Sequence, residues 1–181
     1  VRQDHHRQGL QGHGRPGYTG RVLIERAFVT GLGSFDAQGI NVATSGAVVI
    51  RNSVFEATGA MRFSAQGAAT LEVRNNELRA NNLVTYVASN PDVPVALELN
   101  GITTGTKVVQ GNRIAAGMLL VKGGNGWQLG GLNAGEGNVL MGPRAVLELY
   151  NSAGNKIQGN YLRHDYHGGF SQGFNLYAQG S

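Results

Sequence analysis

The sequence predicts an all-β fold, a parallel β-helix of stacked short strands, on the strength of three observations. A pattern of two strands around a sharp corner recurs along the chain, and its clearest early copies are Val48-Val-Ile-Arg-Asn-Ser-Val-Phe55 and Leu71-Glu-Val-Arg-Asn-Asn-Glu-Leu78. The copies follow one another at intervals typical of a repeat protein. No stretch shows helical periodicity. Each coil is therefore expected to hydrogen-bond to the next at the strand spacing of about 4.8 Å.

The corners of this pattern carry a small or amide residue in every copy. The aligned corner residues are Ala27, Ser53, Asn76, Asn112, Asn138 and Asn160, at intervals of 26, 23, 36, 26 and 22 residues. The long interval predicts a loop insertion over residues 88–104, where prolines and an Asn-Gly pair supply turn chemistry. In a stack the asparagines would lie above one another and satisfy backbone groups that the bend frees, so we expect a structural role for them.

A third strand is expected to complete each coil after its corner. The predicted strands cover residues 38–43, 60–64, 83–87, 117–122, 145–150 and 173–178, and a further short strand is predicted at 8–11. Alternating apolar residues such as Ile40 and Val42, or Met61 and Phe63, would fill the core. The polar residues between them would lie on the outer face.

Composition indicates one globular domain spanning residues 1–181, with a first coil and loop over 1–20 and a loop over 163–172. Hydrophobic residues make up 41% and charged residues 14% of the chain. No cysteine is present, so disulfides are excluded, and no apolar run approaches the roughly 20 residues that cross a bilayer. Because the chain begins at Val1, we expect a mature or trimmed product, or a fragment of a longer protein.

The net charge of +4 is modest, although five arginines lie within the first 26 residues. An anionic partner is compatible with this charge, as is an ordinary solvated surface with one basic end. The dense Lys/Arg runs with interleaved aromatic residues that nucleic-acid-binding proteins show are missing, so no nucleic acid is expected as a partner.

The segments Gly130-Gly-Leu-Asn-Ala-Gly-Glu-Gly-Asn-Val-Leu140 and Gly154-Asn-Lys-Ile-Gln-Gly-Asn-Tyr-Leu162 resemble the right-handed parallel β-helix repeats of the pectin-lyase-like superfamily. The resemblance covers roughly residues 21–178 and implies a single-stranded right-handed solenoid of six to eight coils. Near the start, His6-Arg-Gln-Gly-Leu10 followed by Val22-Leu-Ile-Glu25 and Gln38-Gly-Ile-Asn-Val42 is similar to a coil pair in polysaccharide-processing and phage tailspike members. These motifs are specific for the fold and carry little information about a reaction.

The resemblance implies that an extended sugar chain binds along the outer face of one sheet. The candidate substrate-binding residues are Arg7, Gln8, Asn41, Thr85, Glu148 and Tyr177. Arg62 and Lys122 are the candidate catalytic residues, because a cationic side chain can neutralise a uronate carboxylate and, with a lowered pKa, abstract the α-proton in a β-elimination. The alternative is that both serve only solubility. The paired aspartates of the superfamily's hydrolases and the acid clusters of its calcium-dependent lyases are not found.

Two histidine clusters, Asp4-His5-His6 with His13 and His164-Asp165-Tyr166-His167, could bind a metal or act in acid/base chemistry. Neither has the spacing that brings two imidazoles onto one ion, so we expect polar end loops, no metal site and no cofactor.

These observations together predict a secreted or cell-surface protein that recognises a polysaccharide, with an acidic glycan favoured, and that acts as a lyase or C5-epimerase if it is an enzyme. The alternative is a non-catalytic surface or phage adhesin in which the β-helix is a rigid spacer. Membrane insertion is not expected. Open edge strands at the two ends favour a homo-oligomer or end-to-end association.

Overall fold

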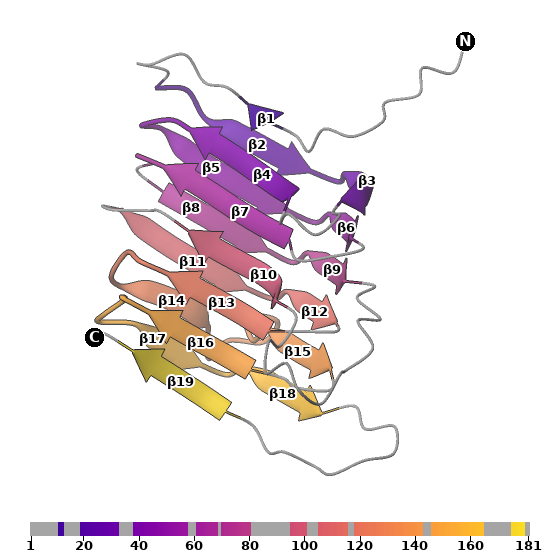
Figure 1. The fold of residues 1–181 in the computed structure, drawn as a ribbon, viewed down its shortest axis with the longest axis vertical. Helices are drawn as coiled ribbons and strands as arrows, with labels where there is room; N and C mark the ends of the chain where they lie inside the picture. The colour runs from indigo at the N-terminus through magenta and orange to yellow at the C-terminus, as the bar shows by residue number, and fades with distance from the viewer. Residues whose placement is uncertain are drawn as a thin grey trace, which may run out of the picture.

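The computed structural model describes residues 11–12, 19–32, 38–57, 61–68, 70–80, 95–100, 105–115, 118–142, 146–164 and 175–179, and this part of the chain is all-β. Its nineteen strands form three parallel sheets (Figure 1). No helix occurs in the described ranges, and hence none that is long and apolar enough to cross a membrane.

Sheet A has seven strands and contains the third strand of each predicted coil. Its order is β1 (Gln11–Gly12), β4 (Gln38–Ala43), β7 (Met61–Gln66), β10 (Val95–Asn100), β13 (Met118–Lys122), β16 (Val146–Tyr150) and β19 (Asn175–Gln179).

Sheets B and C have six strands each and contain the strands before and after the corner motif. Sheet B runs β2 (Val22–Glu25), β5 (Ala47–Arg51), β8 (Thr70–Arg74), β11 (Thr106–Gln110), β14 (Trp127–Gly130) and β17 (Lys156–Gln158). Sheet C runs β3 (Phe28–Leu32), β6 (Val54–Ala57), β9 (Glu77–Ala80), β12 (Arg113–Ala115), β15 (Val139–Gly142) and β18 (Tyr161–His164).

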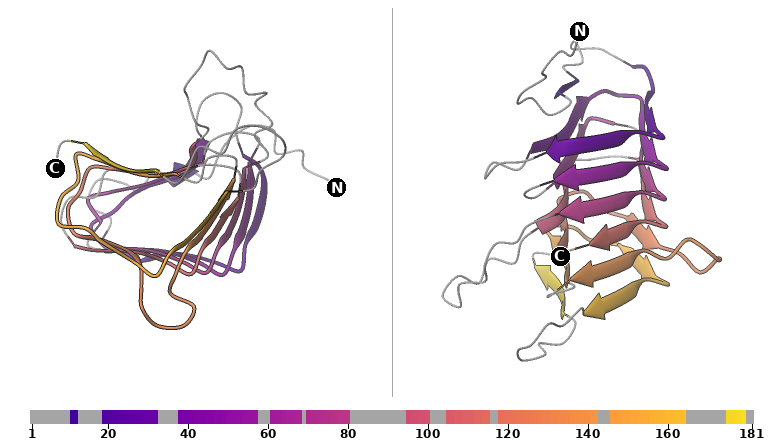
Figure 2. Two further views of the ribbon diagram at one scale, coloured as in Figure 1. Left: turned by 90° about the horizontal axis from the view of Figure 1, so that it is seen from below. Right: turned by 90° about the vertical axis from the view of Figure 1, so that its right-hand side faces the viewer.

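The chain visits the three sheets in turn, and each strand pairs in parallel with the strand three places later in the sequence. We call one strand in each sheet a repeat. Figure 2 shows that successive repeats overlie one another when the molecule is seen from below. A residue in one repeat therefore has a register partner in the next, and side chains of one kind can form columns that run through a whole sheet.

The core consists of such columns from all three sheets. Sheet A contributes the register-aligned, buried Phe63, Leu99, Val121 and Leu149. Phe55 of sheet C packs against Phe63 edge-on, with ring centroids 5.3 Å apart. This arrangement confirms the predicted alternation in sheet A, whereas in β5 and β11 of sheet B consecutive residues are buried.

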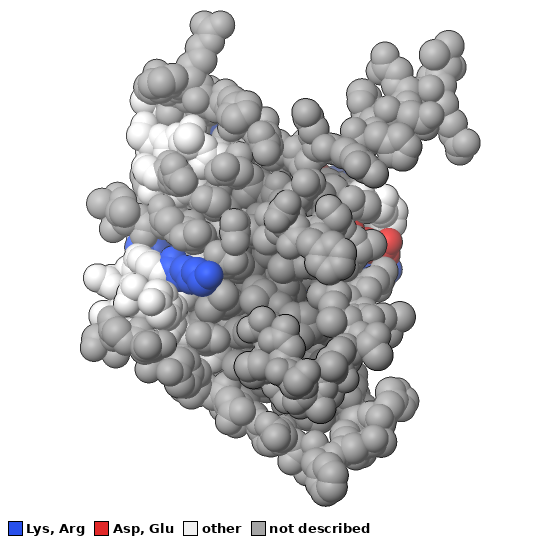
Figure 3. Space-filling view, in the orientation of Figure 1, with Lys and Arg blue, Asp and Glu red and all other residues white. Residues whose placement is uncertain are grey.

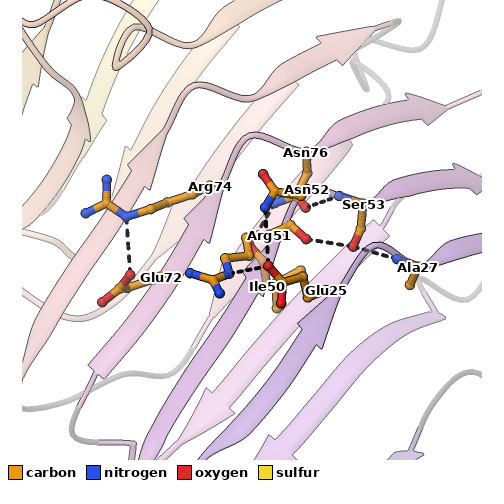
Figure 4. Close-up of polar contacts among 9 residues, drawn as sticks. All are labelled: Glu25, Ala27, Ile50, Arg51, Asn52, Ser53, Glu72, Arg74 and Asn76. Carbon is orange, nitrogen blue, oxygen red and sulfur yellow. Dashed lines mark hydrogen bonds and ion pairs between the residues drawn. The ribbon is translucent and has the colours of Figure 1, made fainter.

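The predicted column of asparagines at the corner between sheets B and C is confirmed. The backbone N–H of Ser53 donates to Oδ1 of Asn76, and the N–H of Asn76 donates to Oδ1 of Asn112. Asn138 and Asn160 continue the same pattern. Each asparagine Nδ2 also donates to a carbonyl of an earlier strand, as Asn76 does to Ile50 (Figure 4). The column therefore satisfies buried backbone groups at every bend.

The residue just before the corner residue adopts a left-handed backbone conformation at five of the six corners, and Gly137 before Asn138 is the exception. The five residues are Arg26, Asn52, Asn75, Gly111 and Gly159, with φ of 53°, 51°, 53°, 66° and 62°. At Gly111 a Cβ would also lie 2.7 Å from the carbonyl oxygen of Gly135, so both the dihedral and the close approach favour glycine.

One predicted boundary needs correction, between the third and fourth repeats. The place in sheet A between β7 and β13 is occupied by β10, Val95–Asn100, inside the stretch predicted to be a loop insertion. The strand predicted at 83–87 lies outside the described residues. Prolines on the N-terminal side of Val95 and the Asn100-Gly pair suggested a turn, but the segment between them alternates apolar and polar residues, as a half-buried strand does.

The other boundaries of sheet A agree with the prediction to within two residues, except at the start of the chain. The strand expected at 8–11 is β1 at Gln11–Gly12, and residues 8–10 are outside the described ranges; β7 runs to Gln66, two residues beyond its expected end. The loop expected over 163–172 begins later than predicted, because Arg163 and His164 belong to β18.

Candidate functional site

The outer face of sheet A is the face on which the sequence placed a sugar-binding site. Its residues alternate along each strand with the buried column of Phe63, Leu99, Val121 and Leu149. The strands of sheet A are mutually parallel and in register, so residues at equivalent positions are separated by about 4.8 Å from one repeat to the next.

One column of this face consists entirely of residues that can hydrogen-bond, and we call it the polar column. Its members in strand order are Gln11, Asn41, Ser64, Asn100, Lys122, Tyr150 and Gln179. It crosses all seven strands of the sheet. Lys122 is half-buried, and Tyr150 is 39% exposed.

A second column lies two residues earlier on each strand, and we call it the charged column. Its members in strand order are Gly39, Arg62, Glu98, Leu120, Glu148 and Tyr177. The two columns lie on the same face because two residues make one full period of a strand. The predicted residues Asn41 and Lys122 thus belong to one column, and Arg62, Glu148 and Tyr177 to the other.

Arg62 and Lys122 are two strands apart, as expected. Arg62 is the register partner of Glu98, Glu98 is the partner of Leu120, and Lys122 follows Leu120 by two residues. Two strand spacings alone give a separation of about 10 Å between their backbones. The two residues therefore belong to different strands and to different columns of the outer face.

Three predicted residues lie outside the described part of the chain, namely Arg7, Gln8 and Thr85. The histidine cluster near the start of the chain also lies outside it, and of the second cluster only His164 is described, at the end of β18. Among the residues that the structure describes, no three His, Asp or Glu side chains come together as a metal-binding group.

Six hydrogen-bonding members of the two columns were missed from the sequence, namely Gln11, Ser64, Glu98, Asn100, Tyr150 and Gln179. Glu98 and Asn100 were assigned to a loop, although the alternation of Val95–Asn100 would have placed them on a strand. Gln11, Ser64 and Tyr150 are the last residues of predicted strands and Gln179 lies one residue beyond one, where composition gives no signal for a ligand. A search for one polar residue per strand at a fixed register would have found the members of the polar column.

Charged side chains on the other two sheets pair with one another. On sheet B, Arg51 Nε lies 3.0 Å from Glu25 Oε1, and Arg74 Nε lies 3.2 Å from Glu72 Oε2 (Figure 4). The hydrogen bond from the Arg51 guanidinium lowers the pKa of Glu25. These contacts follow the rule that opposite charges on neighbouring positions of a sheet attract.

Sheet C carries a similar cluster. Arg79 contacts Glu56 at 2.7 Å and Glu77 at 3.0 Å, and its hydrogen bond lowers the pKa of Glu77. In Figure 3 the acidic side chains that are coloured lie toward the right-hand edge with basic side chains beside them, and a further basic side chain stands out toward the left.

Lys107 is the one charged residue among the buried positions of the described chain. It stands in an interior column between Leu71 and Trp127, both fully buried. Its Nζ donates to the carbonyl oxygen of Gly105 at 2.7 Å, and burial lowers the pKa of its ammonium group. Because the residue is buried and aligned with Leu71 and Trp127, Lys107 belongs to the core and not to the outer face.

The chain was compared with protein-family models, with curated proteins and with solved structures, and none of them matches it.

Proposed function

We propose that the three parallel sheets are the walls of a single-stranded, right-handed parallel β-helix of the pectin-lyase-like type. The strand order supports this, since each strand pairs with the strand three places later in all three sheets. The column of corner asparagines supports it as well, because it needs the same bend at the same place in every repeat.

We further propose that the protein is secreted or displayed on a cell surface and recognises an extended polysaccharide along sheet A. The observation that carries this proposal is the polar column, in which each of seven consecutive strands provides a hydrogen-bonding residue at one register position. A linear glycan presents hydroxyl groups at a similar interval, so one sugar per repeat can meet one residue per strand.

Lys122 and Arg62 would give this face its affinity for carboxylates, and the aromatic rings of Tyr150 and Tyr177 would stack on sugar rings. Their spacing along the stack favours binding over chemistry at a single centre. A non-catalytic adhesin is therefore the form of the proposal that the geometry supports best, and a lyase or C5-epimerase is the second candidate, which rests on the cationic side chains alone.

Two measurements on the full chain test the proposal. Calorimetric titration with soluble polygalacturonate, alginate, hyaluronan and a neutral dextran should give saturable binding to at least one acidic glycan and weaker binding in high salt. Ultraviolet absorbance of the same mixtures reports the unsaturated uronate that a lyase releases. Binding without new absorbance favours the adhesin over the lyase but does not separate it from an epimerase, which forms no unsaturated product. New absorbance favours the lyase, and no binding to any of the four glycans contradicts the proposal.

A further inference from the structure

The charged residues of sheet A follow a regular order that the sequence alone did not reveal. Four consecutive strands, β7, β10, β13 and β16, contain one charged residue each. In strand order these residues are Arg62, Glu98, Lys122 and Glu148. Their signs alternate strictly, and the other three strands of the sheet contain no charged residue.

All four residues fall on the outer face of the sheet. Arg62 precedes the buried Phe63, Glu98 precedes the buried Leu99, and Glu148 stands between two buried leucines. Lys122 follows the buried Val121. Residues adjacent along a strand belong to opposite faces, so this placement follows from the backbone register.

The balance of these charges matters for the ligand. The chain as a whole carries a net charge of +4, but the four charges on this face cancel. A polyuronate has a carboxylate on every sugar, so if its sugars follow the repeats, every second carboxylate would meet Glu98 or Glu148. Juxtaposed like charges oppose binding and are a common means of excluding the wrong partner.

The period of the alternation identifies the ligand that avoids this repulsion. Arg62 and Lys122 are two strands apart, as are Glu98 and Glu148, which corresponds to about 10 Å along the stack. Lys122 stands in the polar column, two residues along the strand from the column that contains the other three. A glycan with a carboxylate on every second sugar can place its carboxylates against the two cations. The intervening sugars then present hydroxyl, amide N–H or amino groups, all of them donors, to the two carboxylates.

We propose that sheet A recognises a linear polysaccharide in which a uronate alternates with an uncharged or amino sugar, and discriminates against polymers with a uronate at every position. This inference rests on the proposed function, because it names the class of glycan that the same face binds. Arg62 and Lys122 attract the ligand, while Glu98 and Glu148 set the specificity.

The test compares two probes of equal length, an unsulfated hyaluronan oligosaccharide, in which glucuronate alternates with an N-acetyl amino sugar, and an oligogalacturonate. The wild-type chain should bind the hyaluronan probe about tenfold more tightly in a calorimetric titration at low salt. The Glu98→Gln/Glu148→Gln variant should bind the oligogalacturonate roughly three- to tenfold more tightly than the parent does. The ratio of the affinities for hyaluronan and oligogalacturonate should therefore be smaller in the variant.

The matched control is Glu56→Gln/Glu72→Gln, which removes two acids from the other two sheets and should leave the ratio of the two affinities unchanged. Thermal unfolding of both variants distinguishes a structural role of Glu98 and Glu148 from a role in specificity. If the two acids only pair with cations across strands, their replacement would lower the unfolding midpoint and leave the preference for hyaluronan unchanged. That result overturns the inference, as does tighter binding of oligogalacturonate by the wild-type chain. Failure to bind either probe contradicts both this inference and the proposed function, whereas binding with the opposite preference contradicts this inference alone.

Discussion

The side-chain Oδ1 of Asn112 accepts the backbone N–H of Asn76 at 3.0 Å, across 36 residues of sequence. The same oxygen accepts Nδ2 of Asn76, while Nδ2 of Asn112 donates to the carbonyl oxygen of Val73 at 2.8 Å and to Oδ1 of Asn138 at 3.0 Å. One buried amide thus connects three successive repeats. The longest interval between corner residues, from Asn76 to Asn112, is bridged by the same hydrogen bond as the shorter intervals. The corner contact is therefore kept across this interval.

Replacing Asn112 by alanine should therefore destabilise the protein strongly. The substitution leaves the buried N–H of Asn76 without its acceptor and the carbonyl of Val73 without a donor, which costs about 2–4 kcal/mol of unfolding free energy. Urea unfolding followed by the fluorescence of Trp127, which is buried, measures the loss. Asn160→Ala is the matched control at the last described corner, where the half-buried amide connects fewer groups, and its loss should be smaller. Equal losses at the two positions would contradict a role that depends on burial.

Arg26 offers a stabilising substitution at the other end of the same column. It has φ of 53°, a conformation that costs about 1 kcal/mol for a residue with a long side chain and less for asparagine. Arg26→Asn should raise the unfolding free energy by roughly 0.5 kcal/mol, because Asn52 and Asn75 already adopt this conformation in the next two repeats. Arg21→Asn, at an exposed position of ordinary backbone geometry, is the control and should change little. If both variants are equally stable, strain at Arg26 is not significant.

Lys107 should make stability depend on pH on the alkaline side. Burial lowers its pKa in the folded state, so the unfolded chain holds this proton more tightly than the folded protein does. Stability should then rise as pH increases through the folded-state pKa toward the ordinary lysine value of about 10.4.

Lys107→Met should remove that rise and increase stability at neutral pH by about 1 kcal/mol, because a buried ammonium is replaced by an apolar side chain of similar length and the exposed Gly105 carbonyl can bind water. Lys156→Met, an exposed lysine of sheet B, is the control. A destabilised Lys107→Met variant with an unchanged pH profile would show that the hydrogen bond to Gly105 outweighs the cost of burial.

The part of the fold that the sequence predicted best is the corner between sheets B and C. Asn76, Asn112, Asn138 and Asn160 could be aligned without a structure because an amide at a bend has a specific task that few other residues perform. The core columns were predictable for a related reason, since alternation fixes which face of a strand is buried once the strand is recognised.

The assignment of residues to the outer face of sheet A depended on the register between strands, which the local sequence does not encode. β10 was missed because Pro91 and Pro94 precede it and Asn100-Gly follows it, so turn signals surrounded a strand of ordinary alternation. Because β10 was not recognised, Glu98 and Asn100 were not assigned to the outer face of sheet A. Lys107 was not expected in the core, because a lysine within a strand ordinarily lies on the solvent face.

The central claim is that the outer face of sheet A binds a glycan through Arg62 and Lys122, and its most direct test is the binding of the Arg62→Ala/Lys122→Ala variant to an acidic polysaccharide. The control variant, Arg113→Ala/Lys156→Ala, removes one arginine and one lysine from exposed positions of the other two sheets. The account predicts that the Arg62/Lys122 variant loses most of its affinity at low salt, that this loss shrinks at high salt, and that the control binds like the parent. Binding by the Arg62/Lys122 variant as tight as that of the parent at low salt would contradict the account.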